Sequence, residues 1–156
     1  HSVRFRAFFP RERNDFGLIG SSRFRVLIPF RGNDFLLSDY KRMYVIKNHA
    51  PMFVRAWHGH RHEAKALFVA EGTAVIGAVK IDDWETPSKD LQVKRVILSS
   101  LKPSIFVIPP GFANGIMTLS TNTTVCVFSS SSLSESMGDD VRFPARHWDI
   151  WTVEER

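Results

Sequence analysis

Disulfide bonds and membrane-spanning segments are both missing from this sequence. Cys126 is the single cysteine among 156 residues, so no internal disulfide can form. No apolar run approaches the roughly 18 to 20 residues that a membrane span needs. The opening residues, HSVRFRAFFP, contain no apolar signal core. We therefore expect a protein of a reducing compartment, the cytoplasm, with no membrane partner.

Long runs of like charge are absent as well. Lys and Arg number 21 against 16 Asp and Glu, and the resulting formal net charge of +5 is spread along the chain. A mild positive surplus is compatible with ligands that carry phosphate. The sequence shows no groove-reading helix and no aromatic platform for RNA, so we expect no nucleic-acid partner.

Helical periodicity is scarce, whereas short β-rich runs are frequent. Nine candidate strands rich in Val, Ile and Phe are separated by turn signals such as EGT, LKPS, PPGF and STNT. They cover residues 24–30, 42–48, 53–60, 64–72, 73–81, 91–99, 104–109, 114–120 and 123–129. This regular spacing predicts an all-β sandwich or barrel. The length fits a single domain at 1–156, with a core at about 24–130 and a C-terminal tail or short helix at 131–156.

Three of the six histidines alternate within the segment RAWHGHRHE, residues 55–63. On a strand, His58 and His60 project from one face, while Trp57 and Gly59 project from the other. Two imidazoles on one strand face suit metal ligation, which also needs ligands from other segments. They also suit proton transfer, which needs one ring with a pKa near neutral pH. The third alternative is a pair of histidines with only structural or solvated roles. The segment by itself leaves all three open.

The segment VIPPGFANG, residues 107–115, resembles the second conserved motif of the cupin superfamily, and HGH resembles the first. This resemblance implies a jelly-roll fold, also called a double-stranded β-helix. In metal-binding cupins a glutamate follows His-x-His after three or four residues, and a histidine follows the Pro-x-Gly turn. Ala64, Lys65 and Asn114 hold those positions here, and a lysine cation beside a divalent ion costs Coulomb energy. We therefore expect no metal and no other cofactor.

Two groups of metal-independent cupins share more of the pattern: the dTDP-4-dehydrorhamnose 3,5-epimerases and the dTDP-4-keto-6-deoxyhexose 3,4-ketoisomerases. YKRMYVI and RAWHGH resemble a strand and the histidine motif of the ketoisomerases, whereas KALFVAEG, KIDDWETPSKDL and IPPGFANG resemble motifs of the epimerases. The resemblance spans about residues 28–128. The resemblance implies an isomerase or epimerase whose substrate is a 4-keto-6-deoxyhexose linked to a nucleotide, dTDP. It also implies a role in deoxysugar or surface-polysaccharide biosynthesis, and a homodimer.

The same resemblance assigns roles to individual side chains. His58 would be the base that removes a proton next to the ketone, with His60 as a proton relay or orienting partner. Because an imidazolium depresses the pKa of a neighbouring ring, the pair would divide the acid and base roles. Tyr44 is a further catalytic candidate and has the parity to share a strand face with Arg42. The substrate-binding candidates are Arg42, Arg55, Lys65 and Asn114.

Departures from both groups leave two alternatives. Asn114 stands where the epimerases have a histidine, and TTVCVFSSSS lacks the pattern that carries their catalytic tyrosine, with Cys126 at the nearest aligned position. A cupin that binds a sugar nucleotide without turning it over is therefore the second hypothesis. A metal-dependent cupin is the third, since His62 and Glu63 lie close to the ligand positions.

Overall fold

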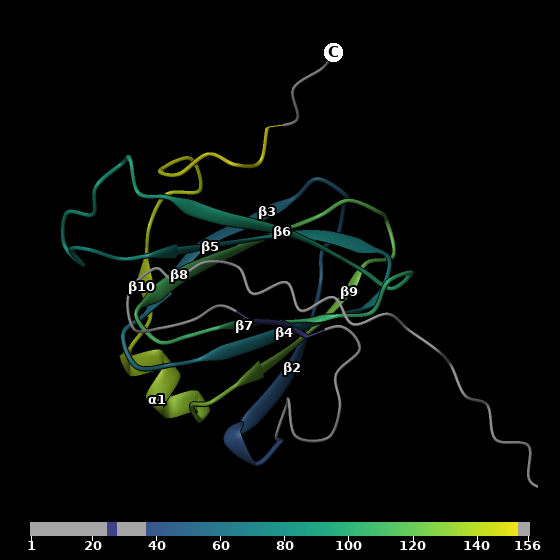
Figure 1. Cartoon of the computed structure of the whole chain (residues 1–156), viewed down its shortest axis with the longest axis horizontal. Coiled ribbons are helices and arrows are strands. Elements are labelled where there is room, and N and C mark those ends of the chain that lie inside the picture. Colours follow the sequence, from purple (N-terminus) through teal and green to yellow (C-terminus); the bar gives the residue numbers. More distant parts are fainter. Residues whose placement is uncertain (1–24, 28–36, 153–156) are drawn as a thin grey trace, which may run out of the picture.

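The computed structural model describes residues 25–27 and 37–152, which form two antiparallel sheets stacked face to face (Figure 1). The strands of the described residues are β1 (Arg25–Leu27), β2 (Arg42–Lys47), β3 (Val54–His60), β4 (Lys65–Glu71), β5 (Thr73–Lys80), β6 (Val93–Ser99), β7 (Ile105–Ile108), β8 (Phe112–Thr118), β9 (Thr124–Ser129) and β10 (Val141–Arg142). Two short helices accompany them, the 3-10 helix η1 (Leu37–Asp39) and the α-helix α1 (Leu133–Gly138). None of the helices in these ranges has the length and apolarity that crossing a membrane requires.

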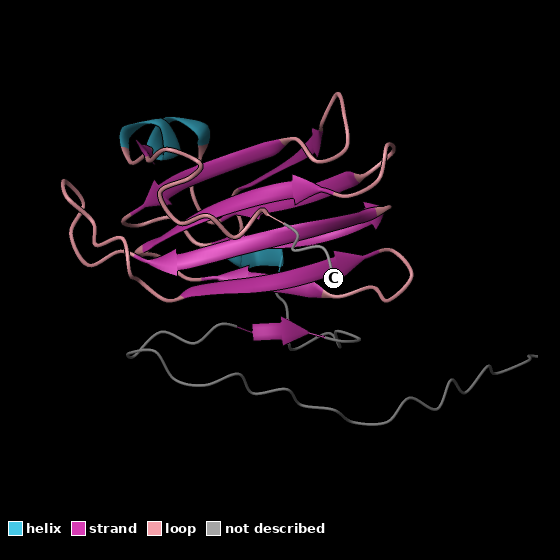
Figure 2. Cartoon of the chain, turned by 90° about the horizontal axis from the view of Figure 1, so that it is seen from above, coloured by secondary structure: helices cyan, strands magenta, loops and turns pink. Residues whose placement is uncertain are grey.

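Each sheet combines strands from distant parts of the chain. The strand order is β1-β7-β4-β9-β2 in the first sheet and β10-β3-β8-β5-β6 in the second. Figure 2, viewed from above, shows the long strands of one layer running side by side. The chain therefore crosses repeatedly between the layers, as expected of a jelly roll. The all-β prediction is confirmed, and each of the nine expected runs contains a strand, although residues 24 and 28–30 of the first run lie outside the described residues.

Two details, at β8 and β10, differ from the sequence-based expectation, and the short helix agrees with it. Strand β8 begins at Phe112, two residues before the predicted start, because Gly111 adopts a φ of 85° and completes the reversal there. Strand β10 was not predicted. The serine-rich segment forms α1, and its start carries a capping box: the Ser132 hydroxyl accepts from the Glu135 amide, and the Glu135 carboxylate accepts from the Ser132 amide.

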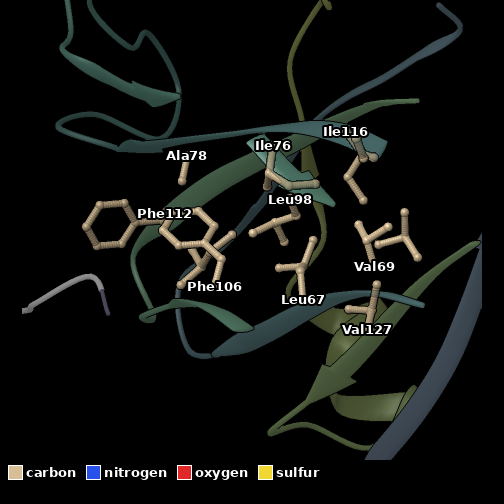
Figure 3. Close-up of a cluster of buried hydrophobic side chains, with 12 residues drawn as sticks. Leu67, Val69, Ile76, Ala78, Leu98, Phe106, Phe112, Ile116 and Val127 are labelled. Atoms are coloured by element: carbon tan, nitrogen blue, oxygen red, sulfur yellow. The ribbon is translucent and has the colours of Figure 1, made fainter. Parts of the chain in front are cut away.

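Apolar side chains from both inner faces fill the space between the sheets (Figure 3). The first sheet contributes Leu67, Val69, Phe106 and Val127, and the second contributes Ile76, Leu98, Phe112 and Ile116. Full burial of one such side chain stabilises the fold by roughly 1.5–3 kcal/mol. The packed core fixes the inward-facing positions at the ends of the same strands, and those positions build the cavity described below.

A second apolar cluster covers the outer face of the second sheet, where the C-terminal segment lies above β5 and β3 in Figure 1. Trp57 of β3 packs against Trp148 and Trp151, with ring centroids 5.6 and 5.1 Å away. The indole nitrogens of Trp57 and Trp151 both donate to the carbonyl of Ala145, at 3.1 and 3.0 Å. The C-terminal segment therefore packs against the outer face of β3, the strand that carries the paired histidines. The expected short helix and docked tail are both present.

Candidate active site

A cavity of about 630 Å³ opens between the inner faces of the two sheets, with α1 and β10 forming part of its wall. All of the site residues that the sequence proposed line this one cavity: Arg42, Tyr44, Arg55, His58, His60, Lys65 and Asn114. They come from four strands, β2, β3, β4 and β8. The structure thus brings the set together, and the role of each residue stays a prediction.

An irregularity in β3 sends Arg55 to the same cavity as the histidines. Arg55 and His58 are three residues apart, so an unbroken strand would point them to opposite faces. The pairing with β8 shifts between them, because Arg55 lies opposite Ile116 while His58 lies opposite Asn114. Two residues of β3 therefore face one residue of β8, as in a β-bulge. From His58 onward the strand is regular, and His58 and His60 share a face as predicted.

His58 is half-buried and uncharged at neutral pH. Burial, followed by the cations of Arg142 and Lys65, lowers the pKa of the His58 imidazole to about 4. Its Nδ1 lies 3.9 Å from Oδ1 of Asp140, whose other oxygen accepts from Arg142 Nε at 2.8 Å. A neutral ring has a free lone pair, so His58 is able to accept a proton.

His60 is almost completely buried, and a charged side chain lies beside each of its ring nitrogens. Its Nε2 lies 2.9 Å from Lys65 Nζ, and its Nδ1 lies 3.3 Å from Oε2 of Glu63. Burial, followed by the Lys65 cation, lowers the pKa of His60. The depressed pKa values of both histidines therefore arise from burial and neighbouring cations, rather than from one imidazolium acting on the other, as the sequence had suggested.

Tyr44 and Arg42 share the inward face of β2, as their parity predicted. The Arg42 guanidinium carbon lies 5.1 Å from the centre of the Tyr44 ring. Burial raises the pKa of the Tyr44 hydroxyl to about 12, with the Glu63 carboxylate adding to the effect. Tyr44 is thus a hydrogen-bond donor at any physiological pH.

Solved structures resemble this fold, whereas neither a protein-family model nor a curated protein matches the sequence. A dTDP sugar isomerase from Desulfovibrio desulfuricans G20 aligns with a TM-score of 0.60 and 18% identity over 78% of this chain and 78% of its own. The dTDP-4-dehydrorhamnose 3,5-epimerase of Bacillus anthracis gives 0.56 and 21% over 65% and 57%. The 3,4-ketoisomerase QdtA of Thermoanaerobacterium thermosaccharolyticum, in complex with TDP, gives 0.52 and 20% over 69% and 70%.

This chain has the fold of the dTDP-sugar epimerases and ketoisomerases. The cupin jelly roll expected from the motifs is confirmed, and the same two groups that the motifs resemble appear among the structural neighbours. The chain spans 57% of the length of the Bacillus epimerase and 50% of an rmlC epimerase from Mycobacterium tuberculosis.

Within this epimerase and ketoisomerase fold, Asn114 faces the site directly. It lies inside β8, paired with His58 across the strands, and its side chain lines the cavity. Asn114 does not cap the Pro-Pro-Gly turn, because the strand already begins at Phe112. An amide at this position is placed to hydrogen-bond a ligand hydroxyl.

The position aligned with the epimerases' tyrosine does not supply an acid. Along β9 the inward positions are buried and the outward ones are not, and Cys126 is an outward one. Val127, its neighbour, lines the cavity instead. Cys126 therefore takes no part in the site.

A metal does not fit the histidine pair. The third cupin ligand is replaced by Lys65, whose ammonium lies 2.9 Å from His60 Nε2, where a cation would have to bind. Within residues 25–27 and 37–152 no group of three or more His, Cys, Asp or Glu side chains is arranged to hold a metal ion. His62 lies in the bend after β3, where its backbone amide donates to Asp139 at 2.8 Å, and its side chain is exposed.

Sequence reasoning missed the acids that contact the histidines: Asp140 beside His58, and Glu63 and Asp139 beside His60. Glu63 was weighed only as a metal ligand, and Asp140 was not considered. No sequence pattern near either residue indicates its role. Asp140 is far from His58 in sequence, and Glu63 has the appearance of a solvent-exposed residue in a charged turn.

Proposed function

We propose that this protein is an isomerase of nucleotide-linked 4-keto-6-deoxyhexoses that removes a proton from the carbon next to the ketone and returns it. The observation that carries the proposal is a neutral histidine, His58, facing a cavity that also presents Lys65, Arg42 and Arg55. Such a cavity joins a base with cations that suit a diphosphate and a developing oxyanion. The fold is shared with enzymes of this class.

In this mechanism His58 takes the proton from the carbon, and the bonding electrons move into an enolate whose negative charge develops on the ketone oxygen. The Lys65 ammonium and the Tyr44 hydroxyl donate to that oxygen. Arg42 and Arg55 bind the diphosphate, because a guanidinium fork matches phosphate oxygens. Delivery of a proton to the same carbon from the opposite face, by a donor other than His58, gives epimerisation. Return of the proton to the former ketone carbon, with a proton shift between the oxygens, moves the ketone.

The nucleotide and the assembly belong to the same proposal. We take the nucleotide to be dTDP, since one structural neighbour is solved with TDP and another with dTDP-quinovose. Met43 and Val45, 57% and 51% exposed on the outer face of the edge strand β2, support a homodimer, which light scattering would test. A cytoplasmic role in deoxysugar or surface-polysaccharide biosynthesis fits such a substrate.

Proton exchange provides the direct test of the reaction. We expect incubation with dTDP-4-keto-6-deoxyglucose in deuterated water to place deuterium on the sugar, read by NMR. Label at C3 alone, label at C3 and C5, or a ketone moved from C4 identify three different reactions. The absence of any label under conditions where the nucleotide binds would contradict the proposal.

That negative outcome would support a cupin that only binds a sugar nucleotide. One observation favours this second function: Val127 faces the cavity where the epimerases' tyrosine motif would supply an acid. The two functions make opposite predictions for deuterium exchange, so one experiment separates them.

The pH dependence of kcat/KM offers a further test. His58 must be neutral to accept a proton, and its pKa is lowered to about 4 by burial and then by Arg142 and Lys65. We therefore expect activity to persist as the pH falls through 6.5 and to be lost only near 4. Arg142→Gln removes one cation, so the acid limb should move to higher pH. Arg95→Gln, on exposed β6, should leave it in place, and an unmodified enzyme whose limb lies near 6.5 would disprove this account.

A further inference from the structure

Glu63 is a buried carboxylate that the proton-transfer step does not use. It follows β3, and its side chain is 0% exposed. The surrounding loop is firmly anchored, because the two preceding backbone amides donate to the carboxylate of Asp139 at 3.0 and 2.8 Å. The next amide, that of Ala64, donates to Ser130 Oγ at 2.8 Å. The backbone therefore holds the Glu63 side chain in place beside His60 and Lys65, two residues that line the cavity.

The two oxygens of Glu63 face different groups. Oε1 accepts from Ser129 Oγ at 2.8 Å and lies 3.5 Å from Arg42 Nη2 and 3.7 Å from Lys65 Nζ. Oε2 lies 3.3 Å from His60 Nδ1. Oε2 and that Nδ1 are both buried, and neither forms a hydrogen bond with any of the described residues, so the two unsatisfied atoms face each other. The remaining hydrogen-bond capacity of Glu63 is therefore directed at one nitrogen of His60.

Burial restricts the tautomer of the His60 ring. The lowered pKa of His60 keeps the ring neutral, so only one nitrogen carries a proton. With the proton on Nε2, the bare Nδ1 would face Glu63 Oε2 as two buried acceptors, and the Nε2 proton would face the Lys65 ammonium as two donors. With the proton on Nδ1, that proton lies beside the Glu63 carboxylate, 3.3 Å from nitrogen to Oε2, and Nε2 accepts from Lys65 Nζ, 2.9 Å away.

We propose that Glu63 is a positioning residue: it fixes His60 as the Nδ1-protonated tautomer, so that His60 Nε2 accepts from the Lys65 ammonium and holds it in the cavity. His60 then acts as the link between an acid and a lysine, rather than as a second base beside His58. The catalytic meaning of this link rests on the proposed function, in which Lys65 donates to the enolate oxygen. The tautomer itself does not depend on it.

The charge of Glu63 also favours the protonated form of Lys65. Burial lowers the pKa of the Lys65 ammonium, Glu63 and Asp140 oppose that shift, and Arg42 adds to it. His60, at 2.9 Å, and His58, whose pKa the Lys65 cation lowers, are further titratable neighbours of Lys65 in this cavity. Glu63 lies nearest to Lys65 Nζ among the carboxylates, at 3.7 Å, so its removal should make Lys65 lose its proton at a lower pH.

Nitrogen-15 NMR of the histidine rings tests the tautomer in the unmodified protein, without substrate. We expect His60 near neutral pH to show a protonated Nδ1 and an unprotonated Nε2, with its signals assigned by their loss in His60→Gln. A ring protonated on Nε2, or on both nitrogens, would overturn the proposal. This measurement stands even if no variant at Glu63 folds.

Glu63→Gln then tests the effect on Lys65. Loss of the charge should move the pKa of Lys65, followed by NMR of its side-chain nitrogen, down by about one unit or more. The alkaline limb of kcat/KM should move by the same amount. Glu135→Gln is the matched control, because Glu135 is an exposed carboxylate paired with Lys41 at 2.8 Å. An unchanged pKa of Lys65 in Glu63→Gln would reject this role.

The two proposals fail in different ways. If the expected tautomer and Lys65 shift are found but no sugar nucleotide is labelled by deuterium, the link stands and the isomerase assignment fails. If deuterium is incorporated but His60 carries its proton on Nε2, the isomerase assignment stands and the role of Glu63 fails.

Discussion

Replacement of His58 by asparagine is expected to lower kcat by about 10²- to 10⁴-fold, the range that a positioned general base contributes. Asparagine fills a similar space but cannot accept a proton at neutral pH. His58 is only half-buried and contacts Asp140 at a long 3.9 Å, so its loss should leave the fold and the binding of nucleotide intact. Steady-state kinetics, circular dichroism and calorimetry with dTDP measure the three quantities.

His62→Asn is the matched control, because it makes the same substitution four residues further along, at an exposed side chain in the bend after β3. Its kcat should equal that of the unmodified protein. If His58→Asn turns the sugar over normally, His58 is not the base. If it binds no nucleotide at all, the loss of activity says nothing about proton transfer, and the isomerase mechanism has to rest on the deuterium experiment.

Gly115→Ala is expected to destabilise the fold by about 1–3 kcal/mol, the usual cost of overpacking a filled site. A Cβ at Gly115 would lie 2.5 Å from the Cβ of Ala56 and 2.7 Å from Cζ2 of Trp151. Gly115 is the residue of β8 that stands opposite the bulge in β3. One added carbon would therefore push against both the bulge and the C-terminal segment, and thermal or urea unfolding would record the loss.

Gly138→Ala provides the comparison for this prediction. A Cβ there would meet nothing within 4 Å, so its stability should stay close to that of the unmodified protein. Equal unfolding midpoints for both variants would show that the outer cluster yields easily and that the bulge is not tightly packed.

The strands were predictable because their signals are local. Alternating β-branched and aromatic residues mark each strand, and the same period of two placed His58 beside His60 and Arg42 beside Tyr44. Arg55 needed the family resemblance, since a period of two alone points it away from His58. No local sequence pattern predicts the bulge in β3, because its geometry depends on the pairing with β8.

The role of the buried carboxylate Glu63, in contrast, could not be predicted from the sequence. Glu63 becomes a buried partner of His60 only when Ser129, far along the chain, closes over it on β9. A sequence shows Glu63 within a charged turn, where a solvated side chain is the ordinary expectation. The helix α1 is different, because the Ser-x-x-Glu pattern that caps it was readable in the serine-rich segment.

The packing behind β3 gives Trp148 and Trp151 influence over chemistry that they do not contact. The backbone of Trp57 exchanges two hydrogen bonds with Phe143, at 3.0 and 3.1 Å, and the next residue is His58. A disturbance of Trp148 or Trp151 therefore reaches the imidazole through one peptide unit. Substitutions on the outer face of this sheet can therefore change the orientation of the His58 ring. Trp148 and Trp151 are positions to examine when activity changes although every residue that lines the cavity is preserved.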